Sequence, residues 1–237
     1  MIKISKSQSP KALEDLRISA VEKGLNASEA YNTLQNPLKS EVKELLMREQ
    51  GHLCAYCMRR IPDERKLPEG VPNVIIEHWT PRNPSGFDGT AGALDYKNML
   101  AVCSGNQGDR TSKRKSRLTC DAKRDTRLLK VNPLDQSTLD TIYYEVSGKI
   151  KSSDIEIDND LDVILNLNCQ VDTVRLPESR KQAVAAIEEN VAMLNDEEIL
   201  TYSKQILADF ENETDPKTPY IGIIIWWLKD FIKSMEG

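Results

Sequence analysis

The sequence contains only two histidines, His52 and His78, and no apolar run that approaches the ~18 residues needed to cross a membrane. Its opening segment carries lysines but lacks the apolar stretch of a signal peptide. The five cysteines form an odd number, and without a secretory signal this argues against a disulfide framework. We find no internal repeat and no low-complexity segment. We therefore expect a globular protein of the reducing cytoplasm, with no membrane partner.

The 237 residues, 39% hydrophobic and 29% charged, suffice for one substantial core or two small ones. Apolar residues recur at helical spacing from about residue 10 to residue 50, whereas residues 51–130 are rich in proline and glycine and contain short apolar runs. The patterns predict strands at 74–76 and 99–102, a loop over 80–92, a helix over 121–129, a hairpin over 141–151, and helices over 158–167, 177–194, 196–212 and 219–234. We expect an α+β protein with segments 1–50, 51–130 and 131–237.

The formal net charge of -5 is unevenly distributed. Residues 109–130 contain nine lysines and arginines against three aspartates, whereas residues 151–237 contain eight basic and eighteen acidic residues. Screening limits each charge to a local field, so the basic stretch is a candidate for phosphate binding despite the acidic total. The alternative interpretation is that the basic stretch is an ordinary solvated surface. The candidate nucleic-acid-binding residues are Lys113, Arg114, Lys115, Arg117, Lys123 and Arg124.

Four of the cysteines bracket His78 in the sequence. Cys54 and Cys57 form a C-x2-C turn that lets two thiolates reach one tetrahedral ion, and Cys103 and Cys120 follow the histidine. We predict that the four thiolates hold a structural zinc ion. The alternative is that the first pair is a redox motif or packs as small apolar residues, and that the second pair is unrelated. Cys169 is expected to be a buried apolar residue.

Glu77 and His78 stand together at the end of a predicted strand, in the segment Ile75-Ile76-Glu77-His78-Trp79-Thr80-Pro81. Phosphodiester hydrolysis requires a base for water and a cation for the developing charge. The imidazole can take the proton near neutral pH, and the carboxylate is the hard oxygen ligand that Mg²⁺ or Mn²⁺ prefers. Neighbouring strand residues point to opposite faces, so the strand must twist or end here for both residues to share one site.

Three further residues complete the candidate site, each with an alternative. Asp121 follows the last cysteine and is a candidate catalytic residue and second ligand of the catalytic ion, although aspartate is also a good helix N-cap. Asn106 competes for that ligand position. Asn98 precedes the second predicted strand, where its amide would fix the loop that orients the imidazole, or would be an ordinary turn residue. His52 precedes the first knuckle and is expected to be structural or solvated.

These motifs together, Cys54-x2-Cys57, Glu77-His78-x2-Pro81, Asn98, Cys103 and Cys120-Asp121-x-Lys123, resemble the HNH endonuclease family. The resemblance implies a ββα-metal nuclease core with a zinc knuckle, His78 as general base, Asn98 as the middle motif residue, and Glu77 with the third motif position as metal ligands. That position is usually histidine or asparagine and here is Asp121. The second knuckle, usually C-x2-C, is stretched by the basic loop.

A weaker likeness covers the flanks. The opening Met1-Ile2-Lys3-Ile4, the element Leu165-Asn166-Leu167-Asn168 and the segment Pro219-Tyr220-Ile221-Gly222 resemble the PtuB-type HNH nucleases. These accompany a PtuA-type ATPase in Septu anti-phage systems and in some retrons. The resemblance implies a nucleic-acid substrate, expected to be DNA with RNA open, and an acidic C-terminal half that packs on the nuclease or binds the ATPase.

Two other functions remain open at this point. One is a zinc-ribbon module that binds nucleic acid without cleaving it, and the other is a structural subunit of a defence complex whose nuclease site is degenerate. The apolar and aromatic residues of 219–234 predict a helix buried within the chain, with a docking surface as the alternative.

Overall fold

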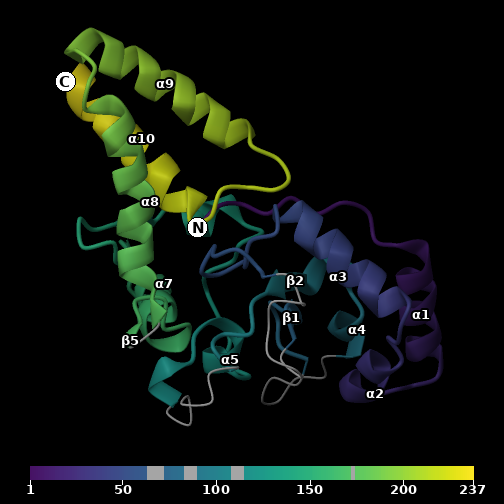
Figure 1. The fold of residues 1–237 in the computed structure, drawn as a ribbon. Coiled ribbons are helices and arrows are strands. Elements are labelled where there is room, and N and C mark those ends of the chain that lie inside the picture. The colour runs from purple at the N-terminus through teal and green to yellow at the C-terminus, as the bar shows by residue number, and fades with distance from the viewer. Residues whose placement is uncertain (63–71, 83–89, 108–114, 172–173) are drawn as a thin grey trace.

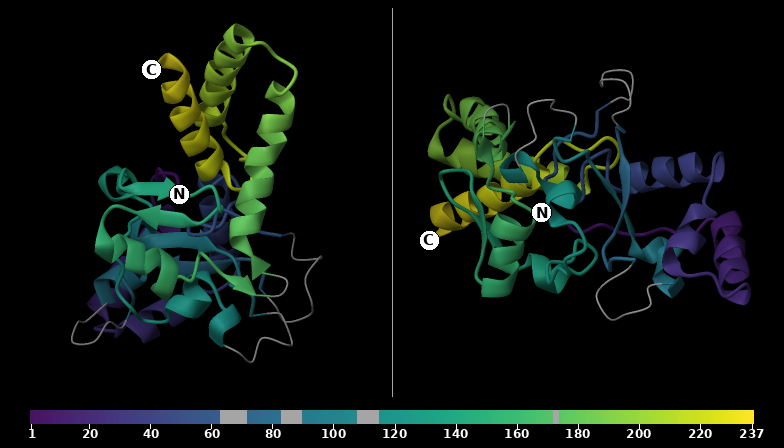
Figure 2. Two further views of the ribbon diagram at one scale, coloured as in Figure 1. Left: turned by 90° about the vertical axis from the view of Figure 1, so that its left-hand side faces the viewer. Right: turned by 90° about the horizontal axis from the view of Figure 1, so that it is seen from below.

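The computed structural model describes residues 1–62, 72–82, 90–107, 115–171 and 174–237. It is a mixed α+β structure with small antiparallel sheets, and it has two visible parts (Figure 1). The body contains the N-terminal helices and all three sheets. The arm, residues 176–236, consists of three helices that extend away from the body, as the turned view on the left of Figure 2 shows.

The N-terminal segment is helical, as predicted, because its apolar residues recur every three to four positions. Leu13 and Ala20 are buried on the first helix, and Val42 and Leu46 on the third. A capping box of Asn26 and Glu29 begins the second. The helices are α1 (Lys11–Glu22), α2 (Ala27–Asn32) and α3 (Leu38–Glu49), and they pack beside the central strands and the short helix α4 (Figure 1).

The centre of the body is a two-stranded antiparallel sheet followed by a short helix. The strand predicted at 99–102 is confirmed, and the one predicted at 74–76 lies at Ile75–His78, so the register places Glu77 opposite Leu100 and His78 opposite Met99. The elements are β1 (Ile75–His78), α4 (Thr90–Ala93), the 3-10 turn η2 (Tyr96–Asn98), β2 (Met99–Val102), the 3-10 turn η3 (Lys115–Arg117) and α5 (Cys120–Arg124). Residues 83–89 of the predicted loop lie outside the described residues, and the loop ends at α4 rather than at residue 92.

The helix predicted over 121–129 is wrong in length, because α5 ends at Arg124. Asp125 follows with φ +60°, which is outside the right-handed helical region. Beyond it, the Arg124 side chain donates to the Arg127 carbonyl at 2.8 Å, and the Arg127 side chain donates to the Arg124 carbonyl at 2.9 Å. The two guanidinium groups thus bind backbone carbonyls that would accept from backbone amides if the helix were longer.

The remainder of the body confirms the predicted hairpin, in which Tyr144 pairs with Ile150. The helix predicted over 158–167 begins earlier, because the Asp154 side chain accepts from the amides of Glu156 and Ile157 and caps it. The elements are α6 (Gln136–Leu139), β3 (Ile142–Tyr144), β4 (Ile150–Ser152), α7 (Ile155–Asn159), the π-helical turn η4 (Asp160–Ile164), β5 (Gln170–Val171) and β6 (Val174–Arg175).

The arm is built around its last helix, which packs against both others. The helices are α8 (Leu176–Val191), α9 (Asp196–Asn212) and α10 (Ile221–Glu236). Ile221, Ile224, Leu228 and Ile232 are buried at helical spacing, so the predicted burial of this stripe is confirmed. Within the described part of the chain, every helix is too short or too polar to cross a membrane.

The start of α10 is held against the segment that contains the first cysteine knuckle. Tyr220, with φ +60°, donates its amide to the Met58 carbonyl at 2.9 Å, and Lys217 donates its amide to the Gly51 carbonyl at 3.0 Å. A Cβ on Gly222 would lie 2.8 Å from the sulfur of Met58, so the first turn of α10 and this thioether are closely packed. One apolar core therefore runs through all three sequence segments.

Candidate functional site

The four cysteines predicted to bind zinc lie together in the core. The sulfur atoms of Cys54, Cys57, Cys103 and Cys120 are within 4.8 Å of one another, and three of these separations are 3.8 Å. Tetrahedral Zn²⁺ with Zn–S bonds of ~2.3 Å requires sulfurs ~3.8 Å apart, whereas a disulfide requires ~2.05 Å. The predicted clustering is confirmed, and its geometry fits a metal such as zinc. We call these residues the thiolate cluster.

The first pair is held in a tight hairpin turn. The Met58 amide donates to the Cys54 carbonyl at 3.0 Å, and the Cys54 amide donates to the Arg59 carbonyl at 3.0 Å. Met58 adopts φ +57°, which completes the turn. The buried side chain of Gln50 bridges the knuckle and β2, since its amide group donates to the carbonyls of Leu53 and Ala101. The spacing of the motif predicted this turn.

The second pair is brought together by a backbone approach that only glycine permits. Gly105 has φ +58°, and a Cβ there would lie 2.3 Å from the Thr119 carbonyl oxygen. The Thr119 amide donates to the Gly105 carbonyl at 3.1 Å, which closes the stretched loop at its base. Asn166 fixes the segment before Cys120, because its side-chain amide donates to the carbonyls of Ser116 and Leu118 at 2.9 Å each.

The guanidinium of Arg59 contacts the sulfur of Cys103 and two neighbouring polar side chains. Its Nε lies 3.2 Å from that sulfur, and its two terminal nitrogens donate to Asn106 and Thr119 at 2.9 and 3.0 Å. Hydrogen bonds from the neighbouring thiols, together with the Arg59 charge, hold the pKa of the Cys103 thiol well below its ordinary value. The side chain of Asn106 is therefore engaged beside the thiolate cluster, and Asp121 is the residue that faces the candidate catalytic cavity.

That cavity has a volume of about 830 Å³ and lies between β1 and α5. The three ionisable residues predicted to be catalytic, Glu77, His78 and Asp121, all line it. Glu77 and His78 reach the same cavity although they are adjacent, because His78 is the last residue of β1 and pairs at the end of the ladder. Both are nearly buried, with 7% and 5% of their surface exposed.

The imidazole of His78 is fixed in one orientation. Its Nε2 lies 2.9 Å from the Ala93 carbonyl oxygen, and since a carbonyl only accepts, Nε2 carries the proton and Nδ1 the basic lone pair. The ring of Tyr31 meets the imidazole edge to face, with centroids 5.2 Å apart. Burial lowers the pKa of His78 to about 4, and the charges of Arg82 and Arg124 act in the same direction. The side chain is therefore a neutral base at neutral pH.

Asn98 holds the loops on either side of the imidazole. Its Oδ1 accepts from the Thr80 amide at 2.7 Å, and its Nδ2 donates to the carbonyls of Thr80 and Gly92 at 2.9 and 3.2 Å. Gly92 precedes Ala93, whose carbonyl binds His78. Asn98 is not among the described residues that line the cavity, and its side chain contacts the two loops instead.

Glu77 faces a second carboxyl group. Burial and the nearby Asp121 raise the pKa of Glu77 to about 8, and the charge of Arg124 opposes this only in part. Two carboxyl groups directed at one cavity are stabilised in their ionised forms when a cation lies between them, and oxygen atoms are the ligands that Mg²⁺ and Mn²⁺ prefer. The donor set therefore fits a hard divalent ion.

The prediction that Arg124 binds nucleic acid is wrong. Its side chain is fully buried, and it pairs with Glu77 and donates to the carbonyls of His78 and Trp79. A charge that is desolvated and already paired inside the core cannot reach a phosphate. Sequence reasoning missed this because the short helix α5 turns this residue inward, while the neighbouring Lys123 lines the cavity.

The structure describes only some of the other basic residues that were predicted to bind nucleic acid. Lys113 and Arg114 lie outside the described residues, as does the side chain of Lys115, so their role stays a prediction. Arg117 is half-buried near the thiolate cluster, where its carbonyl accepts from Asn106 at 2.9 Å. His52 lies at the surface, 3.4 Å from Asp215, in line with the structural or solvated role expected of it.

Sequence reasoning overlooked three residues around the cavity. Arg82 and Arg127 line it together with Lys123, and Tyr31 forms part of its wall. The guanidinium of Arg82 lies 4.1 Å from the centre of the Tyr31 ring. Arg127 belongs to the basic stretch that the charge distribution had indicated, and Arg82 directly follows Pro81. Nothing in the local sequence of Tyr31 signals its approach to His78, because helix packing brings it there.

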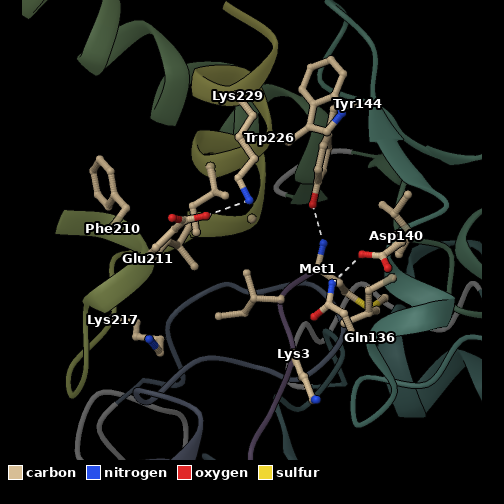
Figure 3. A pocket seen from close by; sticks show the side chains of 16 residues that line it. Met1, Lys3, Gln136, Asp140, Tyr144, Phe210, Glu211, Lys217, Trp226 and Lys229 are labelled. Atoms are coloured by element: carbon tan, nitrogen blue, oxygen red, sulfur yellow. Dashed lines mark hydrogen bonds and ion pairs between the residues drawn. The ribbon is translucent and has the colours of Figure 1, made fainter. Parts of the chain in front are cut away.

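A second cavity, of about 480 Å³, separates the arm from the body (Figure 3). Two pairs of polar residues that line it interact, since Lys229 pairs with Glu211 at 2.7 Å and Gln136 donates to Asp140 at 2.7 Å. The amine of Met1 donates to the Tyr144 hydroxyl at 2.6 Å. Of the two cavities, the one beside β1 brings a histidine and two carboxyl groups together.

Comparison with known proteins adds no family assignment. Neither a protein-family model nor a curated protein sequence matches the chain. The fold and the geometry of the site therefore carry the functional argument.

Proposed function

We propose that this protein is a metal-dependent nuclease of the HNH, or ββα-metal, class. The observation that carries the proposal is the meeting of an oriented neutral imidazole with two carboxyl groups in one cavity, while four thiolates close the other end of the same β1, β2 and α5 unit. DNA is the expected substrate, and RNA carries the same phosphodiester chemistry.

Each residue has a distinct part in the proposed reaction. His78 takes a proton from water at Nδ1, because Nε2 is held by the Ala93 carbonyl. Glu77 and Asp121 hold a divalent cation such as Mg²⁺ or Mn²⁺, which supplies charge stabilisation for the leaving oxygen when bound. Asn98 keeps the Thr80 and Gly92 loops in place around the base. The thiolate cluster, filled by zinc, takes no direct part because a four-thiolate site is closed to water.

The cations around the cavity support an anionic substrate. Arg82, Lys123 and Arg127 line it together with Glu77, His78 and Asp121. Phosphate binding by such side chains releases counterions and makes affinity depend on salt. In this proposal these three residues, with the predicted basic loop that contains Lys113 and Arg114, guide the nucleic-acid backbone across Glu77 and His78.

The test is cleavage of duplex DNA, single-stranded DNA and tRNA by the purified chain in Mg²⁺ or Mn²⁺, with His78→Ala beside the wild type. Loss of the general base should lower the rate ~10²- to 10⁴-fold while nucleic-acid binding persists. His52→Ala is the matched control, because it removes the other histidine, which lies outside the cavity. Equal cleavage by wild type and His78→Ala would refute the proposal.

The rival functions give different results in the same experiment. A zinc-ribbon binding module would bind nucleic acid without cleaving it under any metal, and His78→Ala would leave its affinity unchanged. A degenerate structural subunit would neither cleave nor require Glu77 and His78. The assay should be repeated with an ATPase of the Septu type, because the family resemblance extends the proposal to a nuclease subunit of an anti-phage defence system.

The arm is the proposed binding surface for such an ATPase. Beside the buried stripe of its last helix, the rings of Trp227 and Phe231 stack with their centroids 5.1 Å apart and remain half-exposed. Exposed apolar surface of this kind is common at binding sites. Co-purification of the ATPase with the intact chain, and its loss in a Trp227→Glu variant that still cleaves nucleic acid, would support this assignment. Undiminished co-purification with that variant would contradict it.

A further inference from the structure

A buried hydrogen-bonded group connects the thiolate cluster to the candidate catalytic cavity. Tyr56 stands between the two cysteines of the first knuckle, Cys54 and Cys57, and its side chain is fully buried. Its hydroxyl donates to Oε1 of Glu77 at 3.1 Å. A residue whose backbone is held between two thiolate ligands therefore contacts the carboxylate that is proposed to hold the divalent cation.

Arg124 completes this group from the other side. Its Nη1 donates to the same Oε1 of Glu77, to the Tyr56 hydroxyl at 3.1 Å and to the His78 carbonyl at 3.0 Å. Its Nη2 donates to the Trp79 carbonyl at 2.5 Å. One buried guanidinium thus fixes the carboxylate together with the end of β1 that carries the base. A planar group with several fixed donors suits this role in a way that lysine does not.

The two donors converge on one oxygen of Glu77. Among the hydrogen bonds of the described residues, Tyr56 and Arg124 both bind Oε1. This arrangement occupies Oε1 with two donors and leaves Oε2 as the oxygen available to a cation. Residues that orient a metal ligand in this manner contribute to metal affinity although they never touch the ion.

We propose that Tyr56 and Arg124 are positioning residues that orient Glu77 for the divalent cation, and that Tyr56 thereby makes cation binding depend on an intact thiolate cluster. The inference rests on the proposed nuclease function and goes beyond it, because it assigns a link between two metal sites. The link follows from the knuckle turn, in which the Met58 amide donates to the Cys54 carbonyl and Tyr56 is held between the two ligands. When the thiolates lose their ion, the turn and the tyrosine hydroxyl lose their fixed place.

The test is Mn²⁺ binding by the full zinc-loaded chain, measured by electron paramagnetic resonance, in wild type and Tyr56→Phe. This variant removes one hydroxyl and keeps the ring, so zinc content and fold should be unchanged. We expect Mn²⁺ affinity to fall ~10- to 100-fold, and cleavage to recover when Mn²⁺ is raised. Tyr144→Phe is the matched control, because it also removes a buried tyrosine hydroxyl but in β3, where it binds the Met1 amine.

A second variant, Arg124→Lys, keeps the positive charge but removes the planar guanidinium with its several donors. It should weaken Mn²⁺ binding to a similar degree. Unchanged Mn²⁺ affinity in Tyr56→Phe would overturn this inference and leave the nuclease proposal standing. Mn²⁺ binding that needs Tyr56, in a chain that cleaves no nucleic acid, would support the inference and overturn the nuclease proposal. Absence of Mn²⁺ binding in the wild type would overturn both.

Discussion

The β1, β2 and α5 unit has the thiolate cluster at one end and the candidate catalytic cavity at the other. The two ends differ in the partners of their polar groups. Around the thiolate cluster the donors of Arg59 are engaged with a sulfur, an amide and a hydroxyl, and the cysteines are all buried. In the cavity, Glu77 and Asp121 instead face one another beside a base. A closed cluster of thiolates contributes stability, whereas two carboxyl groups brought together beside a cavity are candidates for binding a ligand.

Removal of a thiolate should therefore cause the largest loss of stability. Cys120→Ser breaks the cluster, and we expect loss of zinc together with at least about 4 kcal/mol of the free energy of unfolding, or a midpoint lowered by ~10 °C. Elemental analysis and thermal unfolding measure this. Cys169→Ser is the matched control, since Cys169 is buried but outside the cluster. A wild-type chain that contains no zinc would contradict the contrast between the two ends.

Truncation of Asn98 should instead affect the cavity end more than stability. Asn98→Ala leaves the Thr80 amide and two carbonyls without their partners, which costs about 1–3 kcal/mol. Because the loops around His78 then shift, we expect kcat to fall by on the order of 10- to 100-fold with KM nearly unchanged. Asn132→Ala, which removes a side-chain cap on the Leu134 amide in the body, serves as the control. Similar kcat values for the two variants would show that Asn98 has only a structural role.

Substitution of the cavity cations should produce a smaller effect, confined to binding. Arg82→Gln and Lys123→Gln should each weaken nucleic-acid affinity and reduce the slope of log affinity against log salt by ~0.7–0.9. Fluorescence anisotropy over a salt series measures the slope. Lys130→Gln is the control, because Lys130 is not among the described residues that line this cavity. If the slope is the same in all three variants and the wild type, the substrate does not lie along this cavity.

The two ends also differ in how well the sequence predicts them. The C-x2-C spacing, the short apolar runs and the residues Glu77-His78 are local patterns, and they identified the knuckle, the positions of two strands, and Glu77 and His78 of the cavity. The inward turn of Arg124, the approach of Tyr31 to His78 and the clamp of Asn166 on the Cys120 loop depend on packing between distant segments. Periodicity and charge carry no information on such contacts, which explains why a buried arginine was predicted to bind phosphate.

The smallest effect concerns the proton on His78. Burial lowers its pKa to about 4, so the folded chain keeps this imidazole neutral over the range in which an unfolded histidine, with a pKa of ~6.5, gains a proton as pH falls. With only two histidines, proton NMR resolves each ring, and His78→Gln assigns the signals. We expect the His78 signal to stay at its neutral position from pH 8 down to about pH 5. A midpoint near 6.5 would mean that solvent reaches the ring and that the cavity end is more open than the geometry indicates.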